Sequence, residues 1–255
     1  MISVSRFSIT PVKSLARHHP DEVLLEACGV AANRRFFLVR EDGRLFSVTH
    51  HGPLVRVRAE WDTATERLSL AFPDGAVVAD IVRVESRIQT DFWGGRMVHG
   101  RVVSGPWAAA LSAFAGEPLR LVRADAPGGG VDVEPVTVSS TASAAEVASR
   151  GGFASPDGRR YRMLMELDGC SPHEEDSWKG RRFRAGQAVL EMFGPVDRCA
   201  ATTRDPDTGI HDFDALRTIA AYRGLRDGNK IDFGVYARVL EPGRVRVGDR
   251  FEPMR

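Results

Sequence analysis

The sequence has few cysteines, no long apolar run and almost no net charge. Its three cysteines, Cys28, Cys170 and Cys199, lack the regular spacing of a disulfide framework. No apolar stretch approaches the ~18 residues of a membrane-spanning helix. The net charge of +1, from 35 basic and 34 acidic residues, argues against nucleic acid or an anionic membrane as a partner. The first residues do not form a secretory signal, so we expect a reducing cytoplasm.

Common catalytic and nucleotide-binding motifs are also missing. The chain contains no Walker phosphate loop, no dinucleotide-binding glycine fingerprint, and neither an HExxH nor a CxxC pattern. The neighbouring pairs His18-His19 and His50-His51 would point to opposite faces of a strand, so we do not expect them to bind zinc. Any chemistry must therefore come from a less common arrangement of side chains.

Short strand and turn signals dominate the chain. Asp-Gly turns separate apolar runs and predict hairpins over 36–48 and 67–78. Further strands are expected at 54–61, 97–103, 119–123, 160–167, 187–193, 199–203, 233–240 and 244–247. This spacing predicts a mostly-β fold made of barrels rather than a βαβ sheet.

A few short helices interrupt the strands. One is expected over 107–114, between Pro106 and Gly116. A second would be capped by Thr141 or Ser143 and end at Gly151, and a third would be capped by Asp212 and cover 213–222. The glycine-rich run 125–130 predicts a boundary or loop. We therefore expect an amino-terminal β-barrel-like domain of residues 1–120 and a second β-barrel of residues 121–255.

Two short segments carry candidate chemistry. Arg198 directly precedes Cys199, and a positive neighbour favours thiolate, the form that binds soft metals. The turn 205–209 (DPDTG) follows closely. Lys13-Ser14 places an ammonium beside a hydroxyl, a combination that suits phosphate. Taken alone, a buried structural cysteine and a solvated surface lysine are the commoner explanations.

In their order along the chain these segments resemble the MOSC family, named for the carboxy-terminal domain of molybdenum cofactor sulfurase. The resemblance is greatest to the branch with an additional amino-terminal barrel, which includes the mitochondrial amidoxime-reducing component. The matching segments are 11–15 (PVKSL), 33–36 (NRRF), 161–162 (YR), 176–178 (DSW), 198–199 (RC), 205–209, 233–236 (FGVY) and 245–249 (VRVGD).

The resemblance implies a molybdenum–molybdopterin cofactor, and not pyridoxal phosphate, held between two β-rich domains. Cys199 falls on the position of the molybdenum ligand and Asp132 on an acidic position close to the metal, so these two are the expected catalytic residues. Lys13, Ser14 and Arg34 fall on positions that hold the phosphate and pterin. Further cofactor contacts are expected from Arg162, Arg198 and Tyr236.

The chain departs from the family pattern at several positions. Val133 and Glu134 stand where hydroxyl residues are usual, and Met163-Leu164 replaces a proline and an asparagine. In a regular strand Leu164 would share a face with Arg162 and so would face the cofactor. We therefore expect one polar contact to the pterin to be missing.

The resemblance implies reduction of N-hydroxylated or N-oxide-type small molecules. No cysteine-rich extension for an iron–sulfur cluster follows the matched strands, so a separate electron-donor protein of ferredoxin, flavin or cytochrome type is expected. Two alternatives stay open. The protein could be a sulfur carrier with a persulfide on Cys199, or a binding module that keeps the fold without metal.

Overall fold

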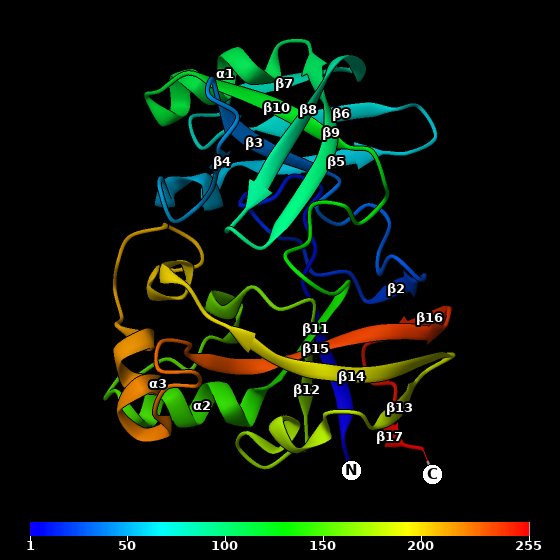
Figure 1. The fold of residues 1–255 in the computed structure, drawn as a ribbon, viewed down its shortest axis with the longest axis vertical. Helices are drawn as coiled ribbons and strands as arrows, with labels where there is room; N and C mark the ends of the chain where they lie inside the picture. Colours follow the sequence, from blue (N-terminus) through cyan, green and yellow to red (C-terminus); the bar gives the residue numbers. More distant parts are fainter. Residues whose placement is uncertain (255) are drawn as a thin grey trace.

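The computed structural model describes residues 1–254, and two β-rich halves follow one another along its long axis (Figure 1). Both termini lie on the lower half in that view. As expected, strands make up most of the regular structure. No helix within residues 1–254 is both long and apolar enough to cross a membrane.

The upper half holds two antiparallel sheets. The larger has the order β4-β3-β10-β9-β8 and the smaller the order β5-β6-β7. Their bounds are β3 Phe36–Arg40, β4 Leu45–Phe46, β5 Arg58–Asp62, β6 Arg67–Ala71, β7 Val77–Ile81, β8 Arg83–Phe92, β9 Arg96–Ser104 and β10 Leu119–Ala124. They enclose a core in which the buried Trp107 donates a hydrogen bond to the carbonyl of Leu68 at 3.1 Å.

The lower half is a seven-stranded sheet of order β1-β12-β11-β15-β14-β13-β17, with a short pair β16-β2 beside it. The bounds are β1 Ser3–Phe7, β2 Glu22–Leu25, β11 Val136–Ser140, β12 Met165–Asp168, β13 Arg182–Ala185, β14 Ala188–Asp197, β15 Asp232–Glu241, β16 Gly243–Arg246 and β17 Phe251–Pro253. Hydrogen bonds from Phe251 N to Ile2 O and from Val4 N to Asp249 O, both 2.9 Å, nearly close this sheet into a barrel.

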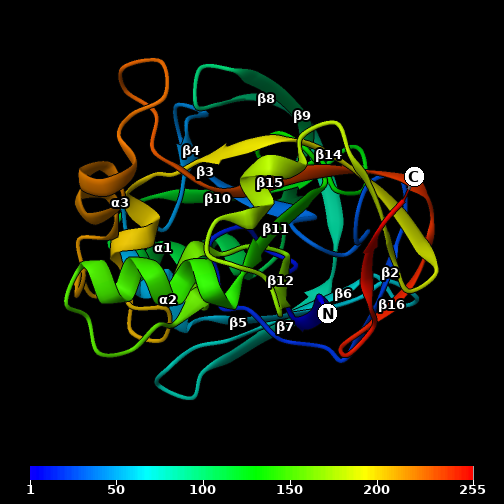
Figure 2. The same ribbon diagram turned by 90° about the horizontal axis from the view of Figure 1, so that it is seen from below.

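Three α-helices and four 3₁₀ helices complete residues 1–254. Their bounds are α1 Trp107–Ala115, α2 Thr141–Arg150, α3 Ala215–Arg223, η1 Gly52–Arg56, η2 Gly158–Tyr161, η3 Glu174–Trp178 and η4 Ala200–Thr203. The helices α2 and α3 lie together beside the lower sheet (Figures 1 and 2). Both are capped by side chains: Ser140 accepts from the backbone N of Ser143, and Asp214 accepts from that of Arg217.

The amino-terminal segment links the two halves. Strands β1 and β2 come first in the chain but pair with β12 and β16 of the lower half, whereas β3 belongs to the upper half. The chain between β1 and β3 therefore passes from the lower to the upper half, with β2 still paired in the lower half. A division of the chain near residue 120 remains a proposal.

Most of the regular elements expected from the sequence are confirmed. The two Asp-Gly hairpins form as β3–β4 and β6–β7, and their turn glycines Gly43 and Gly75 have positive φ angles. Five expected strands appear as β9, β10, β14, β15 and β16, and α1 ends at Gly116 as predicted. The helices α2 and α3 also form, but Ser140 caps the first, and Asp214 rather than Asp212 caps the second.

Two expected strands are wrong in part. The segment 54–61 begins within η1, with Pro53 in the first turn, and becomes a strand only at Arg58. The segment 160–167 begins in η2, where the Asp157 side chain caps the turn, and becomes a strand only at Met165. In both cases the first residues form a turn, which either starts with a proline or is capped by a side chain. Their apolar content alone had predicted a strand.

The expected strand 199–203 is wrong, since η4 occupies it. The hydroxyl of Thr202 donates to the Cys199 carbonyl at 3.0 Å, and that of Thr203 donates to the Ala200 carbonyl at 2.8 Å. These local bonds stabilise a tight turn in place of an extended strand. The turn brings Arg204 against the upper half, where its guanidinium donates to the Thr49 carbonyl at 3.2 Å.

Close contact between two glycines at this junction gives a stability prediction. Gly209 has a φ of 75°, and a Cβ added there would lie 2.1 Å from the carbonyl oxygen of Gly52. Left-handed backbone costs alanine ~1–2 kcal/mol, and overpacking adds ~1–3 kcal/mol. Gly209→Ala should therefore lower the free energy of unfolding by ~2–5 kcal/mol, as measured by urea denaturation.

Gly75→Ala is the matched control. Gly75 has a φ of 91°, but an added Cβ would meet no atom within 4 Å. Only the backbone cost of ~1–2 kcal/mol should appear. Equal losses in the two variants would show that the Gly52–Gly209 contact does not constrain the fold.

Candidate functional site

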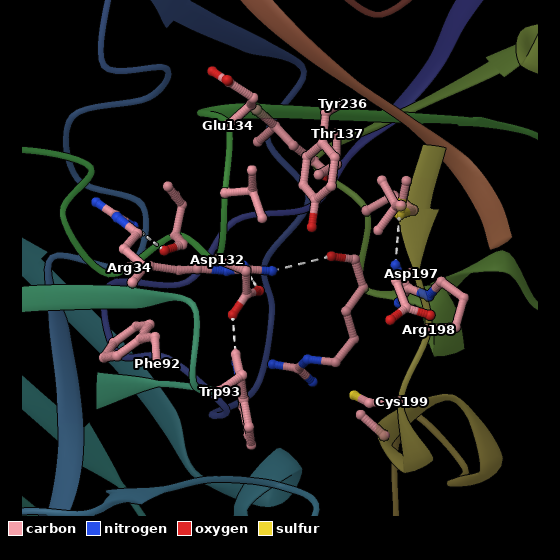
Figure 3. A pocket seen from close by; sticks show the side chains of 18 of the residues that line it. Arg34, Phe92, Trp93, Asp132, Glu134, Thr137, Asp197, Arg198, Cys199 and Tyr236 are labelled. Atoms are coloured by element: carbon pink, nitrogen blue, oxygen red, sulfur yellow. Dashed lines mark hydrogen bonds and ion pairs between the residues drawn. The ribbon is translucent and has the colours of Figure 1, made fainter. Parts of the chain in front are cut away.

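A cavity of about 980 Å³ lies between the two halves and is lined by residues of both. Phe92 and Trp93 reach it from the β8–β9 hairpin, and Tyr236 reaches it from β15 (Figure 3). All the site residues predicted from the sequence line this cavity, namely Lys13, Ser14, Arg34, Asp132, Arg162, Arg198, Cys199 and Tyr236. Positions far apart in the sequence thus meet at one place, whose size suits a small-molecule ligand.

Several cavity residues adopt an unusual backbone conformation. Ser14, Arg34, Trp93 and Arg162 have φ angles of 79°, 52°, 62° and 53°, in the left-handed region. Each such residue costs of order 1–3 kcal/mol and persists only where the surrounding structure imposes it. Strain of this kind concentrates at binding and catalytic sites, so its presence here supports a functional cavity.

Asp132 lies at the centre of a network on the cavity wall. Its Oδ1 accepts from Lys13 Nζ at 2.6 Å and from Trp93 Nε1 at 3.0 Å, and its Oδ2 accepts from Arg34 Nη1 at 2.9 Å (Figure 3). Burial alone would raise the pKa of Asp132. The ion pairs with Lys13 and Arg34 outweigh it and hold this pKa well below its usual range. Asp132 is therefore a carboxylate at neutral pH.

Glycines let the loop that carries Asp132 lie against its neighbours. A Cβ at Gly130 would come within 2.2 Å of the Arg34 carbonyl oxygen, and one at Gly128 within 2.4 Å of the Cys28 carbonyl oxygen. The Gly130 carbonyl also accepts from Lys13 Nζ at 3.0 Å. The run 125–130 is thus a positioning loop of the site, and its glycines are required by close backbone contact.

Lys13 is almost fully buried, with 6% of its surface exposed. Burial lowers its pKa from the ordinary value to about 8, while the charge of Asp132 opposes this shift and that of Arg34 adds to it. Its backbone N donates to the Phe36 carbonyl at 2.8 Å, which fixes the segment against β3. At neutral pH an ammonium is therefore held at the cavity wall.

Arginines surround the turn 161–163. Arg17 donates to the carbonyls of Arg162 and Met163, and Arg198 donates to that of Tyr161. Arg162 donates to the Leu15 carbonyl at 2.8 Å. Burial lowers the pKa of Arg162 to about 9 and also lowers that of Arg17.

Arg17 was not predicted from the sequence, because a lone arginine after Leu15 resembles any solvated loop residue. The nearby basic residues in 13–17 were the only available signal. Among residues 1–254, neither Arg17 nor Arg198 has a carboxylate within ion-pair distance, and the Nε of each is buried without a hydrogen-bond partner. Positive charge at this wall is therefore in excess of what the protein itself neutralises.

Cys199 caps η4 and is the exposed cysteine, whereas Cys28 and Cys170 are half-buried. Its sulfur lies on the cavity side of the chain (Figure 3). The preceding Arg198 donates to the Tyr161 carbonyl and to the Met163 sulfur. Negative charge on Cys199 would act on Lys13 and Arg162. There it opposes the lowering of their pKa values by burial.

Two departures from the family pattern have a clear structural place. Glu134 directs its carboxylate away from the cavity and pairs with Arg238 at 2.6 Å, so it does not repel an anion there (Figure 3). Leu164 also lines the cavity, but it packs in the lower core with 3% of its surface exposed. The expected strand alternation from Arg162 to Leu164 is wrong because the left-handed turn at Arg162 breaks it.

The mouth of the cavity was largely unpredicted. The exposed apolar side chains of Trp93, Val133 and Phe193 line it, with 53%, 53% and 41% of their surface accessible. Tyr236 directs its hydroxyl into the cavity, and burial raises the pKa of this phenol to about 12 (Figure 3). Exposed aromatic residues in a polar hairpin carry no distinctive pattern in the sequence, so only the fold brings them together.

The residues present fit an anionic, metal-bearing pterin ligand. A wall of guanidinium groups and one ammonium suits a phosphate, and an accessible thiol suits a soft metal. Arg17 and Arg198 line the cavity and have no carboxylate partner within residues 1–254, so their positive charge is available to an anionic ligand. Within residues 1–254, no group of three or more His, Cys, Asp or Glu side chains is placed to hold a metal ion.

The sequence is similar to several known proteins. Mitochondrial amidoxime-reducing component 1 of Homo sapiens is 25% identical over 277 aligned residues, which cover 97% of this chain and 81% of that protein. The protein of that name from Mus musculus is 35% identical over 126 residues, covering 46% of this chain and 36% of its own length. Molybdenum cofactor sulfurase of Oryza sativa subsp. japonica is 31% identical over 100 residues, which cover 37% of this chain and 12% of that protein.

One solved structure, the YUAD protein from Bacillus subtilis, aligns over 99% of this chain and 96% of its own, at 13% identity and a TM-score of 0.49. Profiles of two protein families match the sequence in consecutive ranges. The MOSC N-terminal beta barrel domain matches residues 1–99, and the MOSC domain matches residues 125–252. The chain therefore belongs to the MOSC family, in the form that carries the amino-terminal β-barrel domain.

Proposed function

We propose that this protein binds a molybdenum–molybdopterin cofactor in the cavity and reduces N-hydroxylated or N-oxide-type small molecules. The observation that carries the proposal is the convergence of the predicted cofactor residues on one cavity with Cys199 accessible to it. The similarity to proteins named for amidoxime reduction supports the reaction class.

Within this proposal each residue has a distinct role. Cys199 supplies the protein thiolate, and Lys13, Ser14 and Arg34 receive the phosphate. Arg162, Arg198 and Tyr236 provide further contacts. When bound, such a cofactor supplies two-electron oxygen transfer, while the protein binds, orients and shields the reactants.

The overall reaction breaks the N–O bond of the substrate. It consumes two electrons and two protons and releases one water. Because the pKa of Tyr236 is raised to about 12, its phenol stays protonated and can donate a hydrogen bond toward the substrate oxygen. In the ligand-free protein the ion pairs with Lys13 and Arg34 hold the pKa of Asp132 below its usual range, so this carboxylate is negatively charged there.

The electrons would come from a separate protein of ferredoxin, flavin or cytochrome type. A reducing cytoplasm remains the predicted compartment, in keeping with the free cysteines of the chain. The proposed substrate is a small molecule, and nucleic acid and membrane lipid are not proposed as partners.

A sulfur carrier is the second candidate. It is supported by the exposure of Cys199 and by the similarity to molybdenum cofactor sulfurase. A persulfide assay on protein isolated without reductant separates the two functions. A persulfide that transfers to an acceptor would favour the carrier, and bound molybdenum that supports substrate reduction would favour the reductase. Absence of both would indicate a binding module without metal.

The metal prediction concerns Cys199. Protein expressed in cells that make the cofactor should contain molybdenum, and Cys199→Ser should lose most of it, because an alcohol is a poor ligand for a soft metal. Cys28→Ser and Cys170→Ser are matched controls that should retain it. The measurement is molybdenum and pterin per chain by elemental analysis and chromatography. Full occupancy in the Cys199 variant would rule out this ligand.

The lowered pKa of Lys13 predicts a pH dependence. A lysine with a pKa of about 8 loses its positive charge as pH rises through that value. Sulfate, whose charge is constant over this range, should therefore bind the cofactor-free protein more weakly at pH 8.7 than at pH 7, by up to about fivefold. Calorimetric titration measures the change.

Lys13→Arg is the control for this titration, since arginine keeps its charge. Its sulfate affinity should be nearly constant up to pH 8.7, and the range stops there because the pKa of Arg162 is about 9. A similar loss of affinity in both proteins would mean that Lys13 is not the titrating group.

A further inference from the structure

Asp132 pairs with two of the cations that the proposed function assigns to phosphate. Its two oxygens accept from Lys13 Nζ at 2.6 Å and from Arg34 Nη1 at 2.9 Å. An incoming phosphate would bind the same two cations and would meet a carboxylate already paired with them. Asp132 and the phosphate are therefore competitors for one pair of cations.

The competition has a reason in the charge of the cavity wall. Lys13, Arg17, Arg34, Arg162 and Arg198 all line the cavity, and within residues 1–254 Asp132 is the carboxylate that forms ion pairs with members of this group. Buried cations without a counter-ion are strongly destabilising. In the ligand-free protein Asp132 thus supplies the negative charge that a bound phosphate would otherwise provide.

The position of Asp132 allows it to leave. Its backbone is fixed by the glycine contacts at 128–130, but 33% of its side chain is exposed to the cavity. The next residue, Val133, is 53% exposed. Rotation of this one side chain would break its hydrogen bond to Trp93, of 3.0 Å, together with both ion pairs.

We propose that Asp132 is a displaceable counter-ion, which holds Lys13 and Arg34 in the ligand-free protein and releases them to the phosphate group of the cofactor. The inference rests on the proposed function for the identity of the ligand. In this proposal Asp132 weakens the binding of phosphate, and it stabilises the protein when no ligand is bound.

The neighbouring Glu134 offers a matched control. Glu134 lies two residues after Asp132 on the same loop. Glu134→Gln alters the net charge by the same amount as Asp132→Asn. Glu134 also lines the cavity, but its carboxylate points away from Asp132 (Figure 3) and pairs with Arg238 at 2.6 Å. Asp132→Asn and Glu134→Gln therefore separate a local competition for Lys13 and Arg34 from a general effect of charge.

The test is calorimetric titration of cofactor-free protein with inorganic phosphate at pH 7 and low ionic strength. Asp132→Asn should bind phosphate about ten- to hundredfold more tightly than the unchanged protein, since charge-assisted bonds are no longer lost on binding. Glu134→Gln should stay within about twofold. In thermal unfolding, Asp132→Asn should melt lower without phosphate and gain more stability from added phosphate.

Trp93→Phe provides a second, milder variant that keeps the ring and removes one hydrogen bond to Asp132. It should tighten phosphate binding by about two- to tenfold. The proposal fails if Asp132→Asn binds phosphate no more tightly than the unchanged protein, if Glu134→Gln gives the same gain, or if no variant binds phosphate at all. Because the titration uses no molybdenum, its outcome is separate from the metal analysis of the Cys199 variant, which tests the proposed function.

Discussion

Excess positive charge at the junction of two β-rich halves is the constraint on which the site depends. Guanidinium groups from the amino-terminal segment, the 161–163 turn and the end of β14 meet there, with Lys13 buried among them. Their mutual repulsion is offset by backbone carbonyls and by one carboxylate, Asp132. Such an arrangement is unfavourable in an empty protein and becomes favourable when an anion fills the cavity. The excess positive charge of the cavity thus favours an anionic ligand.

Backbone geometry holds this charge in place. Ser14, Arg34 and Arg162 are all left-handed, at a cost of order 1–3 kcal/mol each. Tight packing compensates for the strain: a Cβ on Gly130 would overlap the Arg34 carbonyl, and Arg17 ties down the carbonyls of the 161–163 turn. The side chains that would bind a ligand are therefore positioned by contacts that do not themselves reach it. This division explains why glycines and a non-predicted arginine matter at the site.

The sequence was most informative where local rules decide the structure. Asp-Gly turns fixed two hairpins, and Pro106 with Gly116 delimited α1. Order along the chain was informative for the site, since motif positions far apart in sequence line one cavity. Whether those residues bind a cofactor remains a proposal.

The failures of the sequence analysis share a cause. The segments around Arg162 and Cys199 were read as strands from their composition, but capping by Asp157 and hydroxyl bonds from Thr202 turn them into 3₁₀ helices. Arg198 directly precedes Cys199, and its guanidinium donates to the Tyr161 carbonyl. In these segments the local composition predicted a strand, whereas hydrogen bonds from side chains form a turn. Hydrophobic periodicity and sequence neighbours describe one helix or strand at a time. A site between two halves depends on contacts between distant segments, which these patterns do not contain.

The path of the amino-terminal segment connects site formation to folding. β1 belongs to the lower barrel and β3 to the upper sheet, so the chain between them, with Lys13 and Arg34, is anchored at both ends. Cys199 is reached from the opposite direction, through a turn whose Gly209 contacts Gly52 of the upper half. The thiol and the cations therefore come into register only when both halves are folded and docked. A ligand that contacts both groups would stabilise the docked state by mass action, so binding in the cavity and docking of the two halves would be linked equilibria.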